Sequence, residues 1–274
     1  MKIHIILFTL VFLSSCSSKQ QQGQEQLGLL DTIPMQYNQD LFIPALDAVV
    51  NDSLHFKLFF DTGQPGKFFA AFDDFRSKIG DSAYLQIGKT KMLMPVEFIG
   101  SNKPLYQLLN HLFGEPALLM GWEFFDNKII EFSFENEYLI VHEKLPDITG
   151  YSKNEISRSG FPFLEIPIEF VLQGKIIKDT AAIIDTGNNS HLVISVSSEL
   201  LKKYDINPPN GFRSLPIDTI KIGNQYVAAE QNMRLVYNNK KGPTLIGVRT
   251  LDNFSVILDL INYDLYLKKI SNYN

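Results

Sequence analysis

The chain has 274 residues, a formal net charge of −5 and a sequence pI of about 5.6. This mildly acidic composition, without a block of Lys or Arg, excludes the basic surface that nucleic-acid-binding proteins need. The length allows one or two domains with a sizeable core, and Gly and Pro occur at ordinary frequency, so most of the chain is expected to fold.

The N-terminus has the composition of a secretory signal. Lys2 precedes an apolar run over residues 5–13, which is too short to span a bilayer as an ordinary helix, and small residues follow it. The sequence Leu13-Ser14-Ser15-Cys16 resembles a bacterial lipobox, in which the Cys becomes the lipidated first residue. This resemblance predicts a signal peptide over residues 1–16 and a protein anchored by Cys16 in the bacterial cell envelope, facing the periplasm or the cell surface. A plain cleaved signal with an incidental Cys is the alternative.

Two polar segments divide the rest of the chain. Residues 17–26 carry no apolar period, so residues 17–35 are expected to form a flexible tether. Residues 146–160 contain Pro, Gly and several charges and are expected to link two lobes, over residues 36–145 and 161–274. Because Cys16 is the only cysteine, no disulfide is possible within the mature chain.

The lobes are expected to be rich in short strands, because apolar runs with Ile, Val and Phe are bounded by Gly, Asn, Asp or Pro. Helical spacing of apolar residues occurs only in short segments, of which two follow the aspartate motifs described next. The expected strands include Phe56–Phe60, Leu93–Ile99, Ile129–Val141, Ile176–Ile184 and Val256–Leu267, and the expected helices are Phe68–Ile79 and Val196–Tyr204.

The most informative feature is a repeated triplet. Asp61-Thr62-Gly63 ends one apolar run and Asp185-Thr186-Gly187 ends another. About sixty residues after each triplet, an apolar pair precedes a glycine, Gly121 in the first case and Gly247 in the second. The residues after these glycines align without a gap, and Asp126-Asn127 matches Asp252-Asn253. This period is domain-sized, so the chain is interpreted as two copies of one small lobe.

Each half resembles one lobe of a retropepsin-type aspartic peptidase, and two halves in one chain resemble the bilobal, pepsin-like arrangement. The resemblance covers roughly residues 36–145 and 160–270. It implies a mostly β, acid-protease-like fold with two pseudo-symmetric lobes and short helices. It also implies a monomeric aspartic endopeptidase that cleaves peptide or protein substrates without a cofactor or a metal.

The resemblance assigns a role to each motif residue. Asp61 and Asp185 are expected to form the catalytic dyad. Thr62 and Thr186 are expected to make hydrogen bonds across the lobe interface, with Gly63 and Gly187 completing the tight turns. Gly121 and Gly247 match family glycines at which a strand passes close to the active-site loop.

Two neighbouring carboxylates suit peptide hydrolysis because they share one proton, so that one acts as base towards water while the other acts as acid. Other chemistries lack their motifs. The five His residues are scattered and form no His-Glu-x-x-His pair, and neither a Gly-x-Ser-x-Gly motif nor a phosphate loop is present. His191 follows Asp185 closely but is expected to be a surface or packing residue.

Three alternatives stay open at this point. Asp61 and Asp185 are also explained as ordinary turn residues after strands. The fold is also compatible with lost activity, because Gln64 and Asn188 follow the triplets where the family usually has Ser, Thr or Ala; an envelope lipoprotein that binds peptides in an inter-lobe cleft would result. The flap that covers the family's cleft is expected either in residues 80–95, with Tyr84 over the site, or in residues 207–223.

Overall fold

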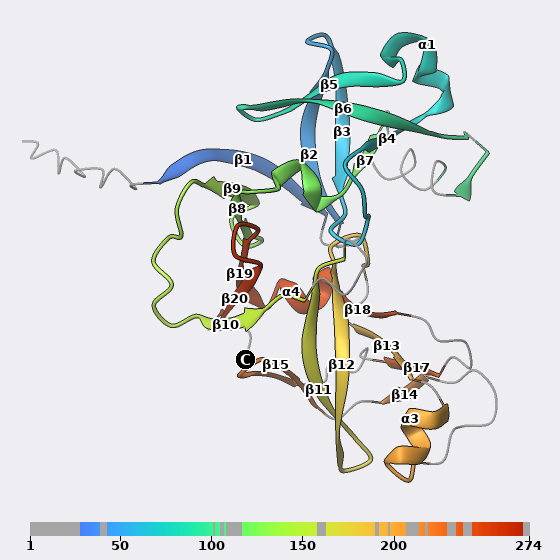
Figure 1. Ribbon diagram of the computed structural model, residues 1–274, viewed down its shortest axis with the longest axis vertical. Helices are drawn as coiled ribbons and strands as arrows, with labels where there is room; N and C mark the ends of the chain where they lie inside the picture. Colours follow the sequence, from blue (N-terminus) through green and yellow to red (C-terminus); the bar gives the residue numbers. More distant parts are fainter. Residues whose placement is uncertain are drawn as a thin grey trace, which may run out of the picture.

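The computed structural model describes residues 28–38, 43–100, 102–104, 107, 117–157, 163–189, 192–196, 198–206, 214–216, 219–228, 234–237 and 243–270. The predicted signal, Cys16 and His191 lie outside these residues. The described chain is mostly β, as expected, and it forms two sheets (Figure 1). None of its helices has the length and apolar character needed to cross a membrane.

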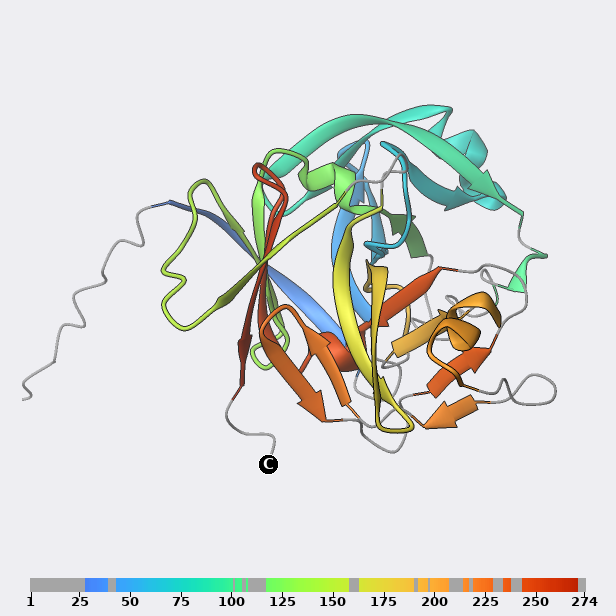
Figure 2. The same ribbon diagram turned by 60° about the horizontal axis from the view of Figure 1, so that its bottom comes forward.

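The larger sheet joins twelve strands from both ends of the chain. In spatial order they are β10 (Ser152–Glu155), β20 (Asp264–Lys269), β19 (Phe254–Asp259), β8 (Ile129–Ser133), β9 (Tyr138–His142), β1 (Leu29–Asn38), β2 (Ile43–Val50), β3 (Leu54–Phe60), β7 (Ala117–Met120), β4 (Phe69–Phe72), β6 (Thr90–Ile99) and β5 (Ser82–Ile87). Strand β5 also pairs with β2, so the second half of this sheet closes into a barrel. The β5–β6 hairpin arches over this barrel in Figure 2.

The smaller sheet is built from the second half of the chain. Its order is β14 (Ser214–Pro216), β17 (Arg234–Tyr237), β13 (Leu192–Val196), β18 (Thr244–Gly247), β12 (Lys175–Asp185), β11 (Glu165–Leu172), β15 (Thr219–Ile222) and β16 (Gln225–Ala228). The described helical segments are short: η1 (Asp73–Phe75), α1 (Arg76–Ile79), η2 (Trp122–Phe125), α3 (Ser198–Lys203) and α4 (Val248–Leu251).

Strand burial follows from the sequence pattern. In β11 every second residue is buried, namely Ile166, Ile168, Phe170 and Leu172, as expected for a strand with one face on the core. Strand β3 instead ends in the continuous buried run Leu58-Phe59-Phe60, because it lies between β2 and β7 inside the barrel sheet. Because of this continuous burial, β3 ends in the interior of the molecule, and the Asp61 turn follows there.

The pairing around each triplet is the same. Strand β3 runs parallel to β7, with Phe60 opposite Met120, and β12 runs parallel to β18, with Asp185 opposite Gly247. Strand β4 then pairs antiparallel with β7 and parallel with β6. In the same way, β13 pairs antiparallel with β18 and parallel with β17. The ends of β3 and β12 approach each other at the middle of the molecule (Figure 1).

Two expected segment boundaries are corrected by these pairings. The tether predicted over 17–35 overlaps β1, which begins at Leu29 and pairs with β9, burying Ile33 and Met35. The linker predicted over 146–160 contains β10, which pairs with β20. Both segments are polar on average, but an alternating strand needs apolar residues on only one face.

The helix expected over Phe68–Ile79 is also partly wrong. Residues Phe69–Phe72 form β4, and helical backbone begins only at Asp73. The four residues of β4 are all buried between β6 and β7, so sheet pairing outweighs the helical spacing of the phenylalanines. The second expected helix begins after β13, as α3.

Candidate active site

The two triplets occupy equivalent turns at the ends of β3 and β12. The backbone N–H of Asp61 donates to the Met120 carbonyl oxygen at 2.9 Å, which extends the pairing of β3 with β7 into the turn. The turns close when Gln64 N donates to Asp61 O at 3.0 Å and Asn188 N donates to Asp185 O at 3.2 Å. The backbone of each aspartate is therefore fixed by hydrogen bonds that do not involve its side chain.

The two threonines tie the turns together through a reciprocal network. Thr62 N donates to Thr186 Oγ1 and Thr186 N donates to Thr62 Oγ1, both at 2.9 Å. Each hydroxyl then donates at 2.7 Å to the opposite strand, Thr62 to the Ile184 carbonyl of β12 and Thr186 to the Phe60 carbonyl of β3. Both side chains are completely buried, so each bond satisfies a group that water cannot reach. The expected cross-connection of the two halves is present.

The triplet glycines leave space for the opposite carboxylate. A Cβ atom on Gly63 would lie 2.6 Å from Asp185 Oδ1, and a Cβ atom on Gly187 would overlap the Asp61 carboxyl group. Each glycine N–H also donates to its own aspartate, at 2.8 Å from Gly63 to Asp61 Oδ1 and at 3.0 Å from Gly187 to Asp185 Oδ1. Any side chain at these two positions would push the carboxylates apart.

Asp61 and Asp185 consequently meet, and their carboxyl groups are hydrogen-bonded to each other. Burial, followed by the charge of Asp185 and the hydrogen bond to it, raises the pKa of Asp61 from 3.8 to about 7. Burial also raises the pKa of Asp185, although the hydrogen bond from Asp61 and the N–H groups of Gly187 and Asn188 oppose the rise. The pair therefore retains one shared proton well above the pH at which a free aspartate ionises.

The later glycines allow close backbone approach, as expected for Gly121. A Cβ atom on Gly121 would overlap the carbonyl oxygen of Gln64, in the turn after the first triplet. Gly247 lies opposite Asp185 in the β12–β18 pairing, and the next residue, Val248, donates its N–H to Asn188 O at 3.0 Å. In both halves the end of the strand that leads to the later glycine, β7 or β18, contacts the aspartate turn.

Sequence reasoning missed two polar residues beside these turns. The Glu123 carboxylate, which is buried in η2, accepts a hydrogen bond from Gly66 N at 2.6 Å. At the matching position of the other half, Arg249 Nε donates to Asn189 O at 2.9 Å. The gapless alignment after Gly121 and Gly247 already placed these two residues at one position. Because Glu123 and Arg249 carry opposite charges, their residue types alone do not indicate that both contact the loop after an aspartate.

The residues directly after the triplets do not supply hydroxyl groups. Gln64 and Asn188 are both partly exposed. The Gln64 amide nitrogen donates to the Pro65 carbonyl at 3.3 Å.

Residues 80–95, the expected flap, form the β5–β6 hairpin, but the tip of this hairpin contacts β1 instead of covering the aspartates. Lys89 N donates to Asp31 Oδ2 of β1 at 2.6 Å, which holds the tip against the outer part of β1. Tyr84 is bound through its backbone to Asn51, at the turn of the β2–β3 hairpin. That turn lies a strand length, roughly 20 Å, from Asp61. Tyr84 therefore does not cover the aspartates. The second flap candidate, residues 207–223, lies largely outside the described residues.

Within the described residues, no group of three or more His, Cys, Asp or Glu side chains is arranged to hold a metal ion. The sequence matches no protein-family model, and no curated protein matches it at a significant level.

Proposed function

We propose that the protein is an aspartic endopeptidase that hydrolyses peptide bonds with Asp61 and Asp185. The observation that carries the proposal is the hydrogen-bonded carboxyl pair, with one pKa raised to about 7, held by the reciprocal threonine network. A turn aspartate needs no buried carboxyl partner, and burying two carboxyl groups together is costly unless they share a proton. Buried carboxyl groups with strongly raised pKa values are typical of sites that transfer protons.

The proposal includes a bilobal, acid-protease-like fold with two pseudo-symmetric lobes. It is supported by the matched strand pairing around each triplet, in which β3, β7, β4 and β6 correspond to β12, β18, β13 and β17. Superposing residues 40–142 on 163–268 is expected to align both triplets and both later glycines. A superposition that separates Asp61 from Asp185 would remove this part of the proposal.

In the proposed reaction, a water molecule lies between the two carboxyl groups and the substrate carbonyl. The Asp185 carboxylate accepts a proton from the water, whose oxygen attacks the carbonyl carbon, while neutral Asp61 donates its proton to the carbonyl oxygen. The tetrahedral intermediate then collapses: Asp185 gives the proton it took from water to the leaving nitrogen as the C–N bond breaks, and Asp61 takes a proton back from a hydroxyl group of the intermediate as the new carboxyl group forms. The N–H groups of Gly63 and Gly187 hold the carboxylates in place throughout.

A peptide library incubated from acid to neutral pH tests this function directly. The wild-type chain is expected to release peptides, and a statine-type analogue is expected to inhibit, because its hydroxyl mimics the tetrahedral intermediate. The Asp61→Asn and Asp185→Asn variants serve as controls for contaminating proteases. Equal proteolysis by the wild type and the double Asn variant would overturn the proposal.

A second candidate is a non-catalytic protein that binds peptides between the two lobes. The observation that favours it is the amide residue after each triplet, because the Gln64 side chain bonds to Pro65 rather than to Asp61. Peptide binding by the double Asn variant and the wild type alike, without cleavage by either, would select this candidate.

We further propose that the protein is a monomeric lipoprotein of the bacterial cell envelope. The support is the lipobox-like sequence that ends at Cys16. The mature protein is expected to begin at lipidated Cys16 and to partition into detergent, and Cys16→Ala is expected to lose the lipid. Wild-type protein recovered without a lipid would contradict the anchor while leaving the peptidase proposal intact.

A further inference from the structure

In each half of the chain a polar side chain stands two residues after the later glycine, Gly121 or Gly247, and it reaches the loop that follows the aspartate. In the first half, Glu123 accepts from Gly66 N at 2.6 Å. In the second half, Arg249 donates to Asn189 O at 2.9 Å. The acceptor and donor are exchanged between the halves, but the target is the same stretch of backbone, four or five residues after Asp185 or Asp61.

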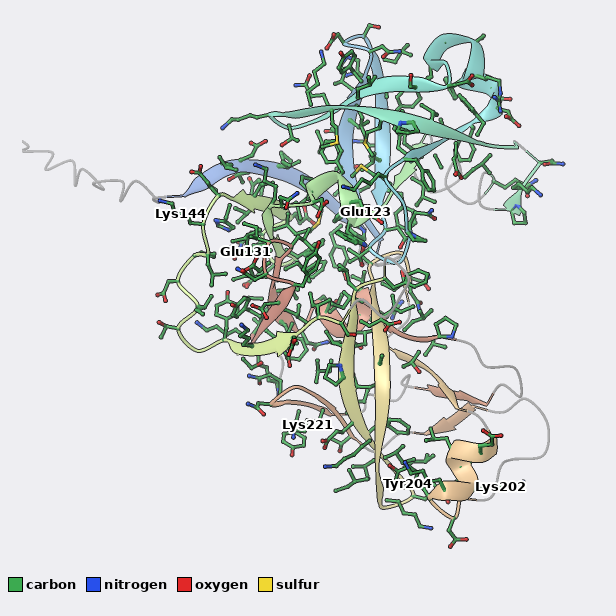
Figure 3. The ribbon with its side chains drawn as sticks, in the orientation of Figure 1. Glu123, Glu131, Lys144, Lys202, Tyr204 and Lys221 are labelled. Carbon is green, nitrogen blue, oxygen red and sulfur yellow. The ribbon has the colours of Figure 1, made fainter. Side chains whose placement is uncertain are left out.

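The first of these contacts belongs to a continuous line of support for the loop. Met120 O holds Asp61 N, Gly121 packs on the Gln64 carbonyl, and Glu123 holds Gly66 N. Strand β7 and the start of η2 therefore follow the loop along its whole length. Figure 3 labels Glu123, a residue of η2, near the centre of the molecule.

Glu123 is more than a surface neighbour of this loop. Only 4% of the residue is exposed, and its neighbours Trp122, Phe124 and Phe125 are buried too. Burying a carboxylate in such a place costs free energy unless strong hydrogen-bond donors satisfy it. The backbone N–H of Gly66 is one such donor. The buried Glu123 carboxylate is thus bound to the loop backbone at Gly66, and this bond restricts the movement of the loop.

We propose that Glu123 and Arg249 are positioning residues. They hold the loops that follow Asp61 and Asp185, so that the two carboxyl groups keep their positions relative to each other. The inference rests on the proposed peptidase function for its kinetic consequence, but its structural part stands apart from that function. A displacement of about 1 Å at a reacting group lowers rates by up to about 100-fold, so loosening either loop is expected to act on turnover.

The kinetic test compares Glu123→Ala with Glu123→Gln. The Ala variant loses the acceptor for Gly66 N, so kcat is expected to fall by about 10- to 100-fold with little change in KM. The Gln variant keeps an oxygen acceptor and is expected to stay within about threefold of the wild type. Glu135→Ala, at an exposed turn residue, is the matched control and is expected to leave activity unchanged.

The structural test needs no activity. Amide hydrogen exchange at Gly66 is expected to accelerate by about tenfold or more in Glu123→Ala, and the carboxyl NMR titration of Asp61 is expected to shift, while amides of β11 stay unchanged. If Glu123→Ala does not fold, Arg249→Gln carries the test, because Arg249 is partly exposed; exchange should then accelerate behind Asp185. Arg76→Gln, on the surface of α1, is its control.

Two results would overturn the inference. One is unchanged exchange and titration in both Glu123→Ala and Arg249→Gln. The other is acceleration spread evenly over the chain in proportion to lost stability, because that indicates a general packing role. If the wild type cleaves no peptide while exchange still accelerates only behind the aspartates, the peptidase proposal fails and the positioning role stands.

Discussion

Thr62 and Thr186 each accept a hydrogen bond from the other's backbone N–H, and each hydroxyl donates to the carbonyl of the residue before the opposite aspartate, so four hydrogen bonds of 2.7 to 2.9 Å connect the ends of β3 and β12. Two residues that are 124 positions apart in the chain are thereby locked together. Neither aspartate turn can shift without breaking bonds in the other, which gives the carboxyl pair a rigid base.

The first prediction concerns these threonines. Thr62→Val or Thr186→Val keeps the shape of the side chain but leaves a buried N–H and a buried carbonyl without their partner. Each variant is expected to lose roughly 2–4 kcal/mol of unfolding free energy, because buried polar groups without partners cost about 1–3 kcal/mol each. Denaturant unfolding measures the loss. Thr32→Val, an exposed strand residue in β1, should change little, and equal losses at all three positions would contradict the assignment.

Replacing either aspartate removes the shared proton. Asp61→Asn and Asp185→Asn are each expected to lower kcat by at least about 10⁴-fold, the scale typical of removing a catalytic group. Near-UV circular dichroism should stay that of the wild type, because Asn keeps the side-chain shape. A variant that retains a tenth of the activity or more would exclude its aspartate from the reaction.

The pH dependence of the rate follows from the raised pKa of Asp61. The active form has one neutral and one ionised carboxyl group, so the rate should be bell-shaped in pH. The pKa of Asp61 is about 7, so the second proton is lost as the pH rises through that value and the rate should fall there. The optimum is therefore expected below neutrality. A rate that keeps rising through pH 7 would disagree with a shared-proton mechanism.

Folding stability should depend on the same proton, with the sign set by the direction of the shift. Asp61 has a pKa of about 7 when folded and 3.8 as a free side chain, so the folded chain binds the proton more tightly. Stability should therefore be greatest at low pH for this group and fall as the pH rises between those two values, by roughly 4 kcal/mol at most. Asp61→Asn should flatten this slope in urea unfolding between pH 4 and 7, and an unchanged slope would contradict the shift.

The triplet glycines give a steric prediction. Gly187→Ala should lower activity strongly, because its Cβ atom would overlap the Asp61 carboxyl group. Gly100→Ala is the control, since its nearest neighbour is the end of the Asn102 side chain, at 3.0 Å, which can move aside. A crystal structure of the Gly187→Ala variant should show separated carboxyl groups. Wild-type activity in that variant would place the reacting groups elsewhere.

The internal repeat allowed much of the site to be predicted. The two triplets and the glycines that follow them share a spacing and a neighbouring pattern, and the structure pairs them in the same way. Local chemistry was enough here, because an apolar run that ends in Asp-Thr-Gly predicts a buried strand followed by a tight turn. The same local signals did not locate the flap, whose tip is bound by Asp31 of β1.

The amino-acid sequence alone predicts the strand-rich character, the two equivalent aspartate turns and the residues that form them, since these depend on side-chain periodicity over a few positions. The pairing of β1 and β10 with the large sheet and the contacts of Glu123 and Arg249 with matching loops emerge only in the folded chain, which also brings the expected partners Asp61 and Asp185 together. The physical reason is that a strand's own pattern specifies which face is buried, but not which distant strand or loop will satisfy its polar groups. That choice depends on the closure of the whole sheet around the core.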